Sequence, residues 1–297
     1  MNDHDRRQVT VSVIIPAYNS AKYVVEAVSS ALASRDVEPE IIVIDDGSTD
    51  DTWEALDRFG DVILKVRQDR GGPYRARNLG ASLARGEWLA FLDADDIWSP
   101  DKLSRQLQLA DDSTGLIYTD RLNFGDIQHV AERQSDSVTL WEGDVFKPLL
   151  LGNFITLSSV LIRKGWFDRL GGFSVEHRGV QDWDLWLRYS AEGGLVKLCR
   201  EPLTHYRWHS NQMSNDLETR AGEREAVIRR IRATARGVRL PTSVIRRAIA
   251  NSCELTAWHA LAARRRGAAG WYLRAAYHWP WNPAVYKGIL KCCIGLS

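Results

Sequence analysis

The sequence predicts an α/β fold: a mostly parallel sheet flanked by helices, followed by a C-terminal helical extension. Short apolar runs alternate with segments of helical periodicity along the first 119 residues, which is typical of β-α-β units. Two of these runs end directly in carboxylates. Beyond residue 215 the chain becomes basic and rich in tryptophan. We therefore expect a domain at 1–215, with halves at about 1–119 and 120–215, and an extension at 216–297.

The composition is that of a soluble globular chain with an uneven charge distribution. Of the 297 residues, 44% are hydrophobic and 26% are charged. Residues 217–297 hold 15 Lys and Arg against 4 Asp and Glu, a net charge of +11, and the remainder holds 24 against 34, a net charge of −10. Such asymmetry favours an acidic partner for the tail, either an anionic membrane surface or nucleic acid.

Cysteine usage and hydropathy bear on the compartment. The four cysteines lack the paired spacing of a zinc site or a disulfide framework, which favours a reducing cytoplasm. The polar start of the chain, residues 1–7, does not resemble a signal peptide. No window approaches the about 20 apolar residues that span a bilayer. We expect a cytoplasmic protein that is not integral to a membrane but lies on its inner face if it contacts one.

The first elements follow from β-branched runs and helical spacing. Residues 10–16 and 40–44 predict buried strands. A turn and N-cap at 17–20 precede a helix with apolar positions between 23 and 32. Ser48 and Asp51 resemble a capping pair for a helix at 52–59.

The same alternation continues through residue 119. Residues 62–66, 88–92 and 115–119 predict three further strands. Pro73 suits the first turn of a helix that Gly86 can terminate. Residues 99–101, Ser-Pro-Asp, predict the start of another helix that runs to 109.

The signals weaken in the second half. We expect an irregular loop with hairpin strands at 120–144, a strand at 154–162 and a loop at 171–173. A helix opens at Gln181, and strands are expected near 195–199 and 203–208.

Helices are expected in the extension near 226–236, 244–266 and 270–278. Aromatic residues alternate there with Arg274, Lys287 and Lys291, a mixture that suits a membrane interface. A helical hairpin whose tryptophans pack on the main domain is the alternative, and the sequence leaves both open.

Carboxylates follow two of the predicted strands. If the extended conformation continues past residue 92, Asp93 and Asp95 face one side together and offer hard oxygen ligands to Mg²⁺ or Mn²⁺. A polar turn capping the next helix is the alternative. Asp45 and Asp46 lie at a second strand end, and ligands of such sheets bind beyond the carboxyl ends of the strands. We therefore expect both acidic pairs to meet at one crevice.

Five motifs in order carry a family resemblance: residues 13–19, 45–50, 76–78, 93–96 and 181–184, with Arg207, Trp208, His209 and Ser214 behind them. In this order and spacing the chain resembles the family 2 glycosyltransferases over about residues 10–215. The resemblance implies the GT-A fold, a Rossmann-like arrangement, and inverting transfer from a nucleotide-diphosphate sugar. It makes residues 1–119 the nucleotide-sugar half and residues 120–215 the acceptor half.

The resemblance also implies roles for single residues. The nucleotide-sugar contacts would be Pro16, Ala17, Tyr18, Asn19, Asp45, Asp46, Arg75, Arg77, Asp93 and Ala94. The ligands of Mn²⁺ or Mg²⁺ would be Asp95, Asp93, Asp96 and His209.

Asp182 would be the base that takes the proton of the acceptor hydroxyl, with Asp184 as its rival. The family usually has Glu-Asp where this chain has Gln181-Asp182, which leaves Gln181 as an acceptor-side contact. His205 is a weaker candidate than His209.

The resemblance predicts a single-addition enzyme. Processive synthases of the superfamily carry Gln-x-x-Arg-Trp before a membrane span, whereas Thr204 occupies the glutamine position here. The expected reaction moves one sugar, from a UDP-sugar, to a glycan or lipid-linked acceptor, as in bacterial surface polysaccharide synthesis. A peripheral membrane contact through the basic helices is one of the two interpretations left open above, and no nucleic acid is expected.

Two other functions remain open. A sugar-nucleotide pyrophosphorylase uses a similar sheet, but residues 16–19 lack the Gly-rich basic segment that would hold a triphosphate. A non-catalytic nucleotide-sugar-binding protein would not need both Asp95 and Asp182.

Overall fold

The computed structural model describes residues 10–127, 130–176, 179–209, 217–263 and 267–294, and these form two compact units. Unit 1 comprises Met1–Val145, Phe154–Val175 and Gly194–Ser210. Unit 2 comprises Phe146–Asn153, Glu176–Gly193 and Asn211–Ser297. The two units are described separately below.

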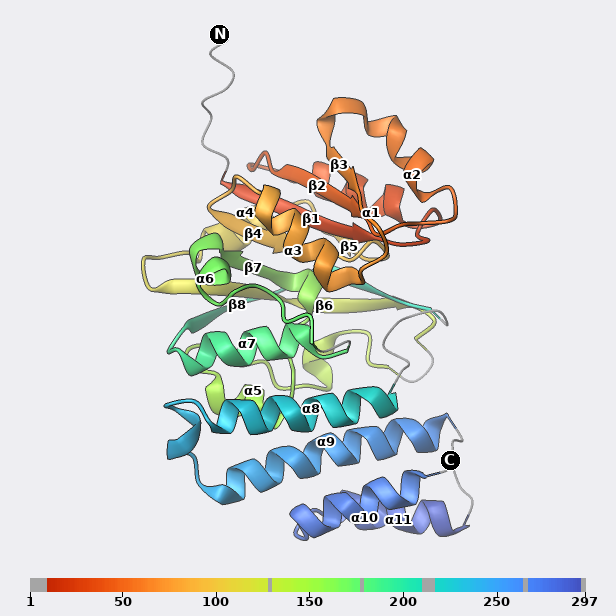
Figure 1. The fold of residues 1–297 in the computed structure, drawn as a ribbon, viewed down its shortest axis with the longest axis vertical. Helices are drawn as coiled ribbons and strands as arrows, with labels where there is room; N and C mark the ends of the chain where they lie inside the picture. Colours follow the sequence, from red (N-terminus) through yellow and green to blue (C-terminus); the bar gives the residue numbers. More distant parts are fainter. Residues whose placement is uncertain (1–9, 128–129, 177–178, 210–216, 264–266, 295–297) are drawn as a thin grey trace. The chain divides into compact units, whose positions relative to one another are not determined.

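Unit 1 is built on one eight-stranded sheet, in the order β3-β2-β1-β4-β7-β6-β8-β5 (Figure 1). The strands are β1 Val11–Ala17, β2 Glu40–Asp45, β3 Leu64–Arg67, β4 Trp88–Phe91, β5 Ile97–Trp98, β6 Thr114–Gly125, β7 Val160–Arg163 and β8 Leu195–Trp208. The helices are α1 Val24–Leu32, α2 Thr52–Ala55, α3 Pro73–Leu83, α4 Lys102–Leu107 and α6 Lys164–Arg169, with 3-10 segments η2 Leu56–Val62, η3 Gln134–Asp136 and η4 Leu157–Ser159.

Four parallel strands place the acidic motifs at one edge of the sheet. Strand β1 pairs in parallel with β2 on one side and β4 on the other, so Ile14 lies opposite both Ile42 and Phe91. The carboxyl ends of β1, β2 and β4 therefore share an edge, as a βαβ arrangement requires. The expected mostly parallel sheet with flanking helices is confirmed. Two strands are exceptions: β7 pairs antiparallel with both β4 and β6, and β5 pairs antiparallel with β8.

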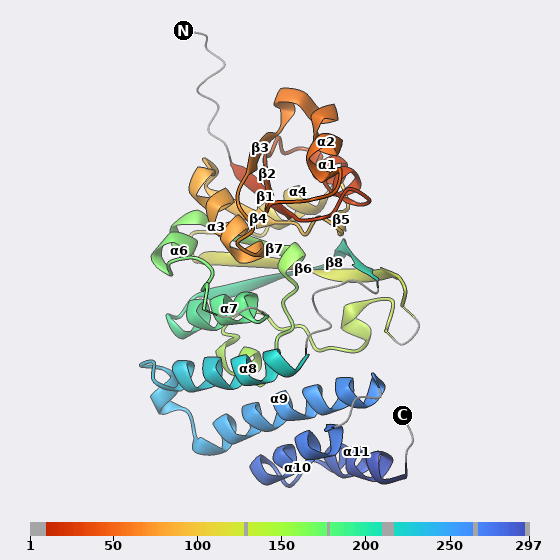
Figure 2. The ribbon, with the colours of Figure 1, turned by 45° about the vertical axis from the view of Figure 1, so that its right-hand side comes forward.

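Alternate side chains of β1 pack on opposite faces of the sheet. Val13 and Ile15 belong to the buried cluster that includes Val28 of α1 and Leu103 of α4. Ile14 points to the other face, where it meets Gly80 of α3 so closely that a Cβ there would lie 2.5 Å from the Ile14 Cγ2 atom. Helices α1 and α4 therefore cover one face of the sheet and α3 covers the other (Figure 2).

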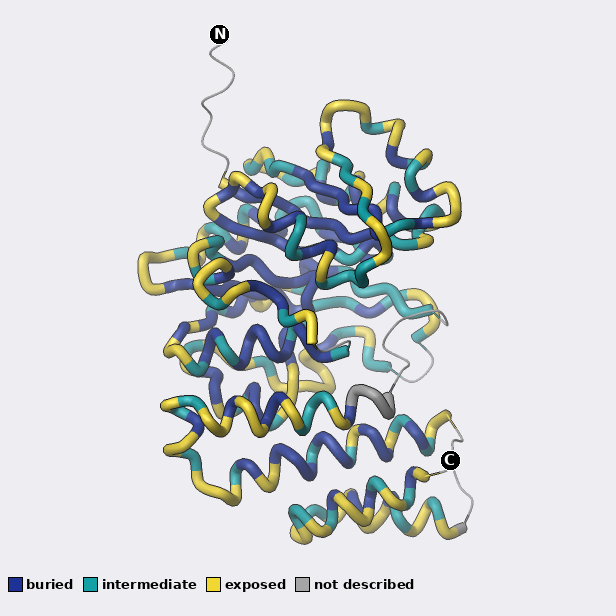
Figure 3. Tube along the Cα trace, viewed as in Figure 1, coloured by how far each residue is buried: buried dark blue, intermediate teal, exposed yellow. Residues whose placement is uncertain are grey.

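Unit 2 is helical. Its helices are α5 Phe146–Leu151, α7 Gln181–Ala191, α8 Leu217–Arg232, α9 Thr242–Ala262, α10 Ala268–His278 and α11 Pro283–Ile294, with the 3-10 segment η6 Gly237–Arg239. Helix α9 packs against α8 and α10 (Figures 1 and 2). Ala248 and Ala257 of α9 are among its buried residues. Figure 3 shows buried stretches along this helix. Among the described residues, no helix has both the length and the apolar character needed to cross a bilayer.

The division into units differs from a boundary at residue 215. Helices α5 and α7 group with the C-terminal helices; α7 bonds to α5, and α5 bonds to α9. The indole Nε1 of Trp183 donates to the carbonyl of Leu149 at 2.7 Å, and Asn251 Nδ2 donates to the carbonyl of Leu151 at 2.9 Å. Residues 210–216, where the boundary was expected, lie outside the described residues.

Several local predictions need correction near the N-terminus. Helix α1 begins after Tyr23, which makes no side-chain capping bond. Ser48 and Asp51 do not cap α2; instead Asp50 accepts a hydrogen bond from the Thr52 amide at 3.1 Å. Gly86 does not end α3, which stops at Leu83.

The second half contains more helix and one longer strand than expected. Residues 154–162 are not one strand, since η4 precedes the short β7. Helices α5, α6 and α11 were not predicted, and the two strands expected at 195–208 form the single bulged strand β8. The expected strand at 115–119 extends to Gly125 as β6, which pairs in parallel with β8. The lengths of β6 and β8 depend on pairing between distant segments, which local periodicity does not encode.

Candidate active site

A turn after β4 gathers three carboxylates. The strand ends at Phe91, and the amide of Asp96 donates to the carbonyl of Asp93 at 3.0 Å, which closes a turn over residues 93–96. Candidate ligand oxygens of Asp93, Asp95 and Asp96 all lie within 4.8 Å of one another. Asp93 and Asp95 lie close together, as expected. The expected cause is wrong, because a turn and not a continued strand brings the two side chains together.

Asp96 is the buried anchor of this cluster. It is 1% exposed, and its oxygens accept hydrogen bonds from Ser158 Oγ at 2.5 Å and from the Arg207 amide at 2.9 Å. Ser158 Oγ also accepts from the Asp93 amide at 3.1 Å. The side chains of Asp93 and Asp95 retain 29% and 27% exposure, so they are the carboxylates that a cation can reach from solvent.

The cluster carries more negative charge than its protein surroundings offset. Burial raises the pKa of Asp95, and the neighbouring carboxylate of Asp93 raises it further. Burial, followed by repulsion from Asp95 and Asp93, raises the pKa of Asp96 well above its ordinary value. An ion at this place would reverse that balance by stabilising the ionised forms.

Two basic side chains from β8 and the residue after it border the cluster. His209 Nε2 lies 2.9 Å from Asp95 Oδ2, and its ring lies against Tyr23, with centroids 5.3 Å apart. Arg207 Nε donates to the Asp95 carbonyl at 2.7 Å, and the same guanidinium forms an ion pair with Glu26 of α1. His209 therefore lies where the sequence predicted, beside the acidic turn.

The other histidine and serine of that motif differ from His209. His205 Nε2 is 3.0 Å from Ser99 Oγ, at the start of the segment that leads into α4, and burial lowers its pKa. Ser214 lies outside the described residues.

Arg77 supports the acidic turn directly. It is 5% exposed and forms an ion pair with Asp93. Its guanidinium lies over the rings of Tyr74 at 4.7 Å and Phe173 at 6.0 Å. Arg75, by contrast, is exposed on the same helix. Arg77 thus offsets part of the charge of the cluster, whereas Arg75 remains accessible from solvent.

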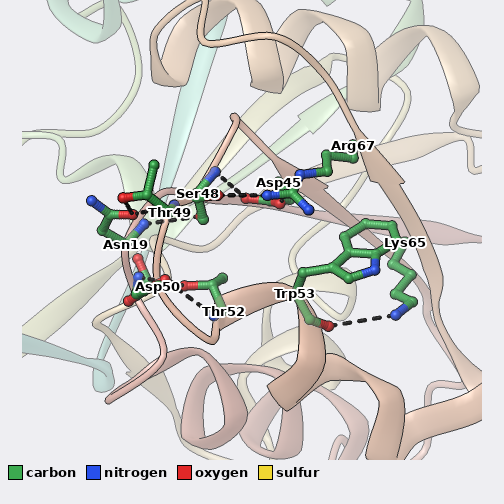
Figure 4. A network of polar contacts seen from close by, with 10 residues as sticks. Asn19, Asp45, Ser48, Thr49, Asp50, Thr52, Trp53, Lys65 and Arg67 are labelled. Atoms are coloured by element: carbon green, nitrogen blue, oxygen red, sulfur yellow. Dashed lines mark hydrogen bonds and ion pairs between the residues drawn. The ribbon is translucent and has the colours of Figure 1, made fainter.

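The loops after β1 and β2 are tied together (Figure 4). Asn19, which adopts φ 47°, donates its amide to Ser48 Oγ at 3.0 Å and accepts from the Thr49 amide at 2.8 Å. Asp45 is fully buried: it accepts from the Ser48 amide at 3.0 Å and pairs with Arg67 Nε at 3.0 Å. Asp45 therefore holds the loop that follows β2.

Asp46 binds the loop that follows β3. Its carboxylate accepts from Gln68 Nε2 at 2.6 Å and from the amides of Gly71 and Gly72, both at 2.8 Å. A carboxylate has about four lone-pair positions, so three bonds leave one for a further donor. Arg70 of this loop lies over the Tyr18 ring at 4.1 Å.

The predicted base and its rival lie on α7 in unit 2. Asp182 is half-buried, and its Oδ2 accepts from Asn153 Nδ2 at 3.0 Å. Asp184 is fully buried and forms ion pairs with Arg188, at 2.9 Å, and with Arg230. Because Asp184 is completely buried and paired with two arginines, it is not accessible to a substrate that would give it a proton. Burial and ion pairing therefore distinguish Asp184 from Asp182.

Gln181 precedes them and is 3% exposed. Its Oε1 atom has no hydrogen-bond partner within the part of the chain that the structure describes. A buried amide oxygen without a donor is uncommon in folded proteins.

Three residues of the site escaped sequence reasoning. Ser158 contacts Asp93 and Asp96. Gln68 contacts Asp46, and Glu26 contacts Arg207. Ser158 and Glu26 belong to ordinary apolar segments and carry no local signal. The glycine pair at 71–72, next to Gln68, is the one sequence feature that indicates a loop suited to wrap a carboxylate.

A mostly parallel sheet with carboxylates gathered beyond its strand ends defines an α/β protein of the kind that binds ligands beyond the carboxyl ends of its strands. Residues 12–171, more than half of the chain, match the family described as glycosyl transferase family 2. The chain therefore belongs to glycosyl transferase family 2.

Two relatives illustrate the range of matches. An uncharacterized glycosyltransferase of Rickettsia felis is 31% identical over 218 residues, which cover 70% of this chain and only 35% of that protein. The matched part of this chain thus spans about a third of the length of that relative. The Escherichia coli UDP-Glc:alpha-D-GlcNAc-diphosphoundecaprenol beta-1,3-glucosyltransferase WfaP is 29% identical, with 69% of this chain and 79% of WfaP covered.

Solved structures share the fold at low identity. Staphylococcus aureus TarS 1-349, in complex with UDP-GlcNAc, superposes with a TM-score of 0.66 at 16% identity and covers 97% of this chain and 92% of its own. The mannosyltransferase PcManGT of Pyrobaculum calidifontis, in complex with GDP-Man and Mn²⁺, gives 0.64 at 18% identity, with coverages of 98% and 82%. These similarities show a common fold.

Proposed function

We propose that this protein is a metal-dependent inverting glycosyltransferase that moves a single sugar from a nucleotide-diphosphate sugar to a glycan or lipid-linked acceptor. The observation that carries the proposal is the cluster of Asp93, Asp95 and Asp96 beyond β4, in a domain of this family. A UDP-sugar is the preferred donor, which the UDP-Glc in the name of the Escherichia coli relative supports.

The donor set suits a hard divalent cation. Its three carboxylates offer oxygen ligands, which Mg²⁺ and Mn²⁺ prefer, and the raised pKa of Asp95 and Asp96 reflects negative charge that such an ion would offset. We assign Asp93 and Asp95 as ligands, His209 as a further ligand and Asp96 as their buried support. When bound, the ion neutralises charge that develops on the departing nucleoside diphosphate.

Residues at the other strand ends would bind the nucleotide. Residues 16–19 line its pocket, and Asp46 accepts from a base N–H through its remaining lone pair. We assign Asp45 to support of this loop, since it is fully buried, and Arg75 to the diphosphate, since it is exposed. Arg77 acts by holding Asp93.

Asp182 is the proposed base. Inversion in one displacement requires a group that takes the proton of the acceptor hydroxyl as the diphosphate leaves from the opposite face. The half-buried carboxylate of Asp182 has the accessibility for this role that Asp184 lacks. Gln181 is proposed as an acceptor-side contact.

The reaction would take place at the cytoplasmic face of a membrane in polysaccharide synthesis. A lipid-linked acceptor resides there, and the basic helices of unit 2 supply a membrane contact. This contact does not depend on the donor or on the metal.

A panel of nucleotide sugars tests the proposal. Metal-dependent hydrolysis of one UDP-sugar, abolished by chelator and restored by Mn²⁺, is the expected result. Asp182→Asn should still bind UDP and Mn²⁺ by calorimetry but should lose transfer. Equal turnover with chelator present would exclude the metal role, and UDP binding without turnover of any donor would leave a binding protein.

A further inference from the structure

The helical hairpin of α10 and α11 exposes large apolar side chains. The five are Leu273, Tyr277, Trp281, Tyr286 and Leu290, and together they are called the hairpin surface. Trp281 and Tyr277 are 80% and 76% exposed, and none of the five is less than 49% exposed. Leaving such side chains in water forgoes the stabilisation of their burial, so five of them on one helical hairpin indicate an interaction site.

Each helix presents its part of this surface as a ridge. Leu273 and Tyr277 are one turn apart on α10, as are Tyr286 and Leu290 on α11, so each pair lies on one side of its helix. The opposite sides are used for packing (Figure 3). Tyr272 is buried against Gly288, where a Cβ would lie only 2.2 Å from the ring.

The turn between the helices is held in place. Asn282 Nδ2 donates to Glu254 Oε2 at 2.6 Å, and Arg246 donates to the carbonyl of Tyr277 at 2.8 Å. Tyr286 Oη donates to the carbonyl of Pro280 at 2.9 Å. Trp281 is therefore exposed on a turn that is fixed by hydrogen bonds, and little conformational entropy is left to lose when it docks.

The charge of the hairpin identifies its partner. Between residues 268 and 294 the chain contains Arg274, Lys287 and Lys291 and no Asp or Glu. Arg274 forms an ion pair with Glu225 of α8, so Lys287 and Lys291 are the exposed cations that the hairpin offers to a partner. A two-fold dimer through this surface would set lysines against lysines, because such an interface is self-complementary. Exposed aromatic side chains beside exposed lysines match the headgroup region of an anionic bilayer.

We infer that the hairpin surface is the membrane-docking face of this protein: its five apolar side chains enter the headgroup region of an anionic bilayer while Lys287 and Lys291 contact lipid phosphates. This inference refines the membrane contact proposed above and is independent of the glycosyltransferase chemistry. It assigns docking to 27 residues of unit 2, from α10 through α11, and not to the whole basic tail.

Cosedimentation of the full chain with vesicles tests the inference. We expect binding to vesicles of phosphatidylglycerol and phosphatidylcholine and little binding to phosphatidylcholine alone. Tyr277→Ser/Trp281→Ser should weaken binding at least about tenfold, because it removes two side chains that become buried in the bilayer on docking. Lys287→Glu/Lys291→Glu should weaken it at least about tenfold at low salt and have a smaller effect at high salt.

The matched control is Val62→Ser/Trp141→Ser, which removes two exposed apolar side chains from unit 1. It should bind vesicles as the wild type does. All three variants change solvent-exposed positions, so unchanged melting temperatures are expected and show that folding is intact.

Equal vesicle binding by the hairpin variants and the wild type would overturn the inference. So would a dimer in light scattering that the Tyr277→Ser/Trp281→Ser variant dissociates, or preference for DNA over vesicles. Metal-dependent hydrolysis of a nucleotide sugar, measured without lipid, separates the two proposals. Vesicle binding without hydrolysis would support the docking inference and contradict the proposed function. Hydrolysis without vesicle binding would contradict the docking inference alone.

Discussion

Replacing Asp95 by asparagine tests whether the carboxylate cluster binds a divalent cation. In the wild type, Mn²⁺ at 100 times its dissociation constant should stabilise the fold by about 2.7 kcal/mol. For a domain of about 150–250 residues, each kcal/mol raises Tm by about 2–4 °C, so unit 1 should melt about 5–11 °C higher with Mn²⁺.

The asparagine variant keeps the shape of the side chain but loses one charged ligand. If its affinity for Mn²⁺ falls about 100-fold, the same Mn²⁺ concentration adds only about 0.4 kcal/mol, or about 1–2 °C. Without metal, the variant should melt no lower than the wild type. The reason is that the folded state raises the pKa of Asp95, so its ionised form opposes folding at neutral pH.

The assay is differential scanning fluorimetry with chelator, with Mg²⁺ and with Mn²⁺. Asp112→Asn serves as the control, because Asp112 is exposed and lies outside the cluster. It should show the full shift of the wild type. An equal Mn²⁺ shift in Asp95→Asn and the wild type would place the ion elsewhere and refute the assignment.

Four further substitutions test the base and its rival, the support of the cluster, and the sheet. Asp182→Asn should lower transfer by about 10²–10⁴-fold with an unchanged Mn²⁺ shift, in line with the loss of a general base. Asp184→Asn should instead lower stability by about 3–5 kcal/mol in chemical denaturation, because its two arginines would lose their charged partner. If the two variants behave alike, the base is misassigned. Ser158→Ala should cost about 1–3 kcal/mol, measured in urea, and reduce the Mn²⁺ shift, because buried Asp96 loses a donor; an unchanged shift would mean that this support is not needed. Gly86→Ala should cost about 1–3 kcal/mol by the same measurement, since its Cβ would lie 2.5 Å from a backbone nitrogen of β1, and unaltered stability would contradict that packing.

Much of the first half of the fold could be predicted from local pattern. The β-branched runs at 10–16 and 40–44 became β1 and β2 in parallel register, because each is apolar on both faces and is followed by a helix that must cross over the sheet. The carboxylates after β4 were expected to converge and they do. The roles of Asp182 and His209 were proposed from motifs whose spacing is visible in the sequence, and they stay predictions.

The sequence by itself therefore determined the parallel strands, the acids at their ends and the family, because these depend on neighbours in the chain. Only the tertiary structure decided that β7 enters antiparallel beside β4, that Ser158 and Arg207 anchor Asp96, and that arginines neutralise Asp184. Each of these contacts joins segments that are distant in the chain or unremarkable in composition. Their free energy comes from burial and hydrogen bonds formed only when the whole fold closes, so no local pattern can report them.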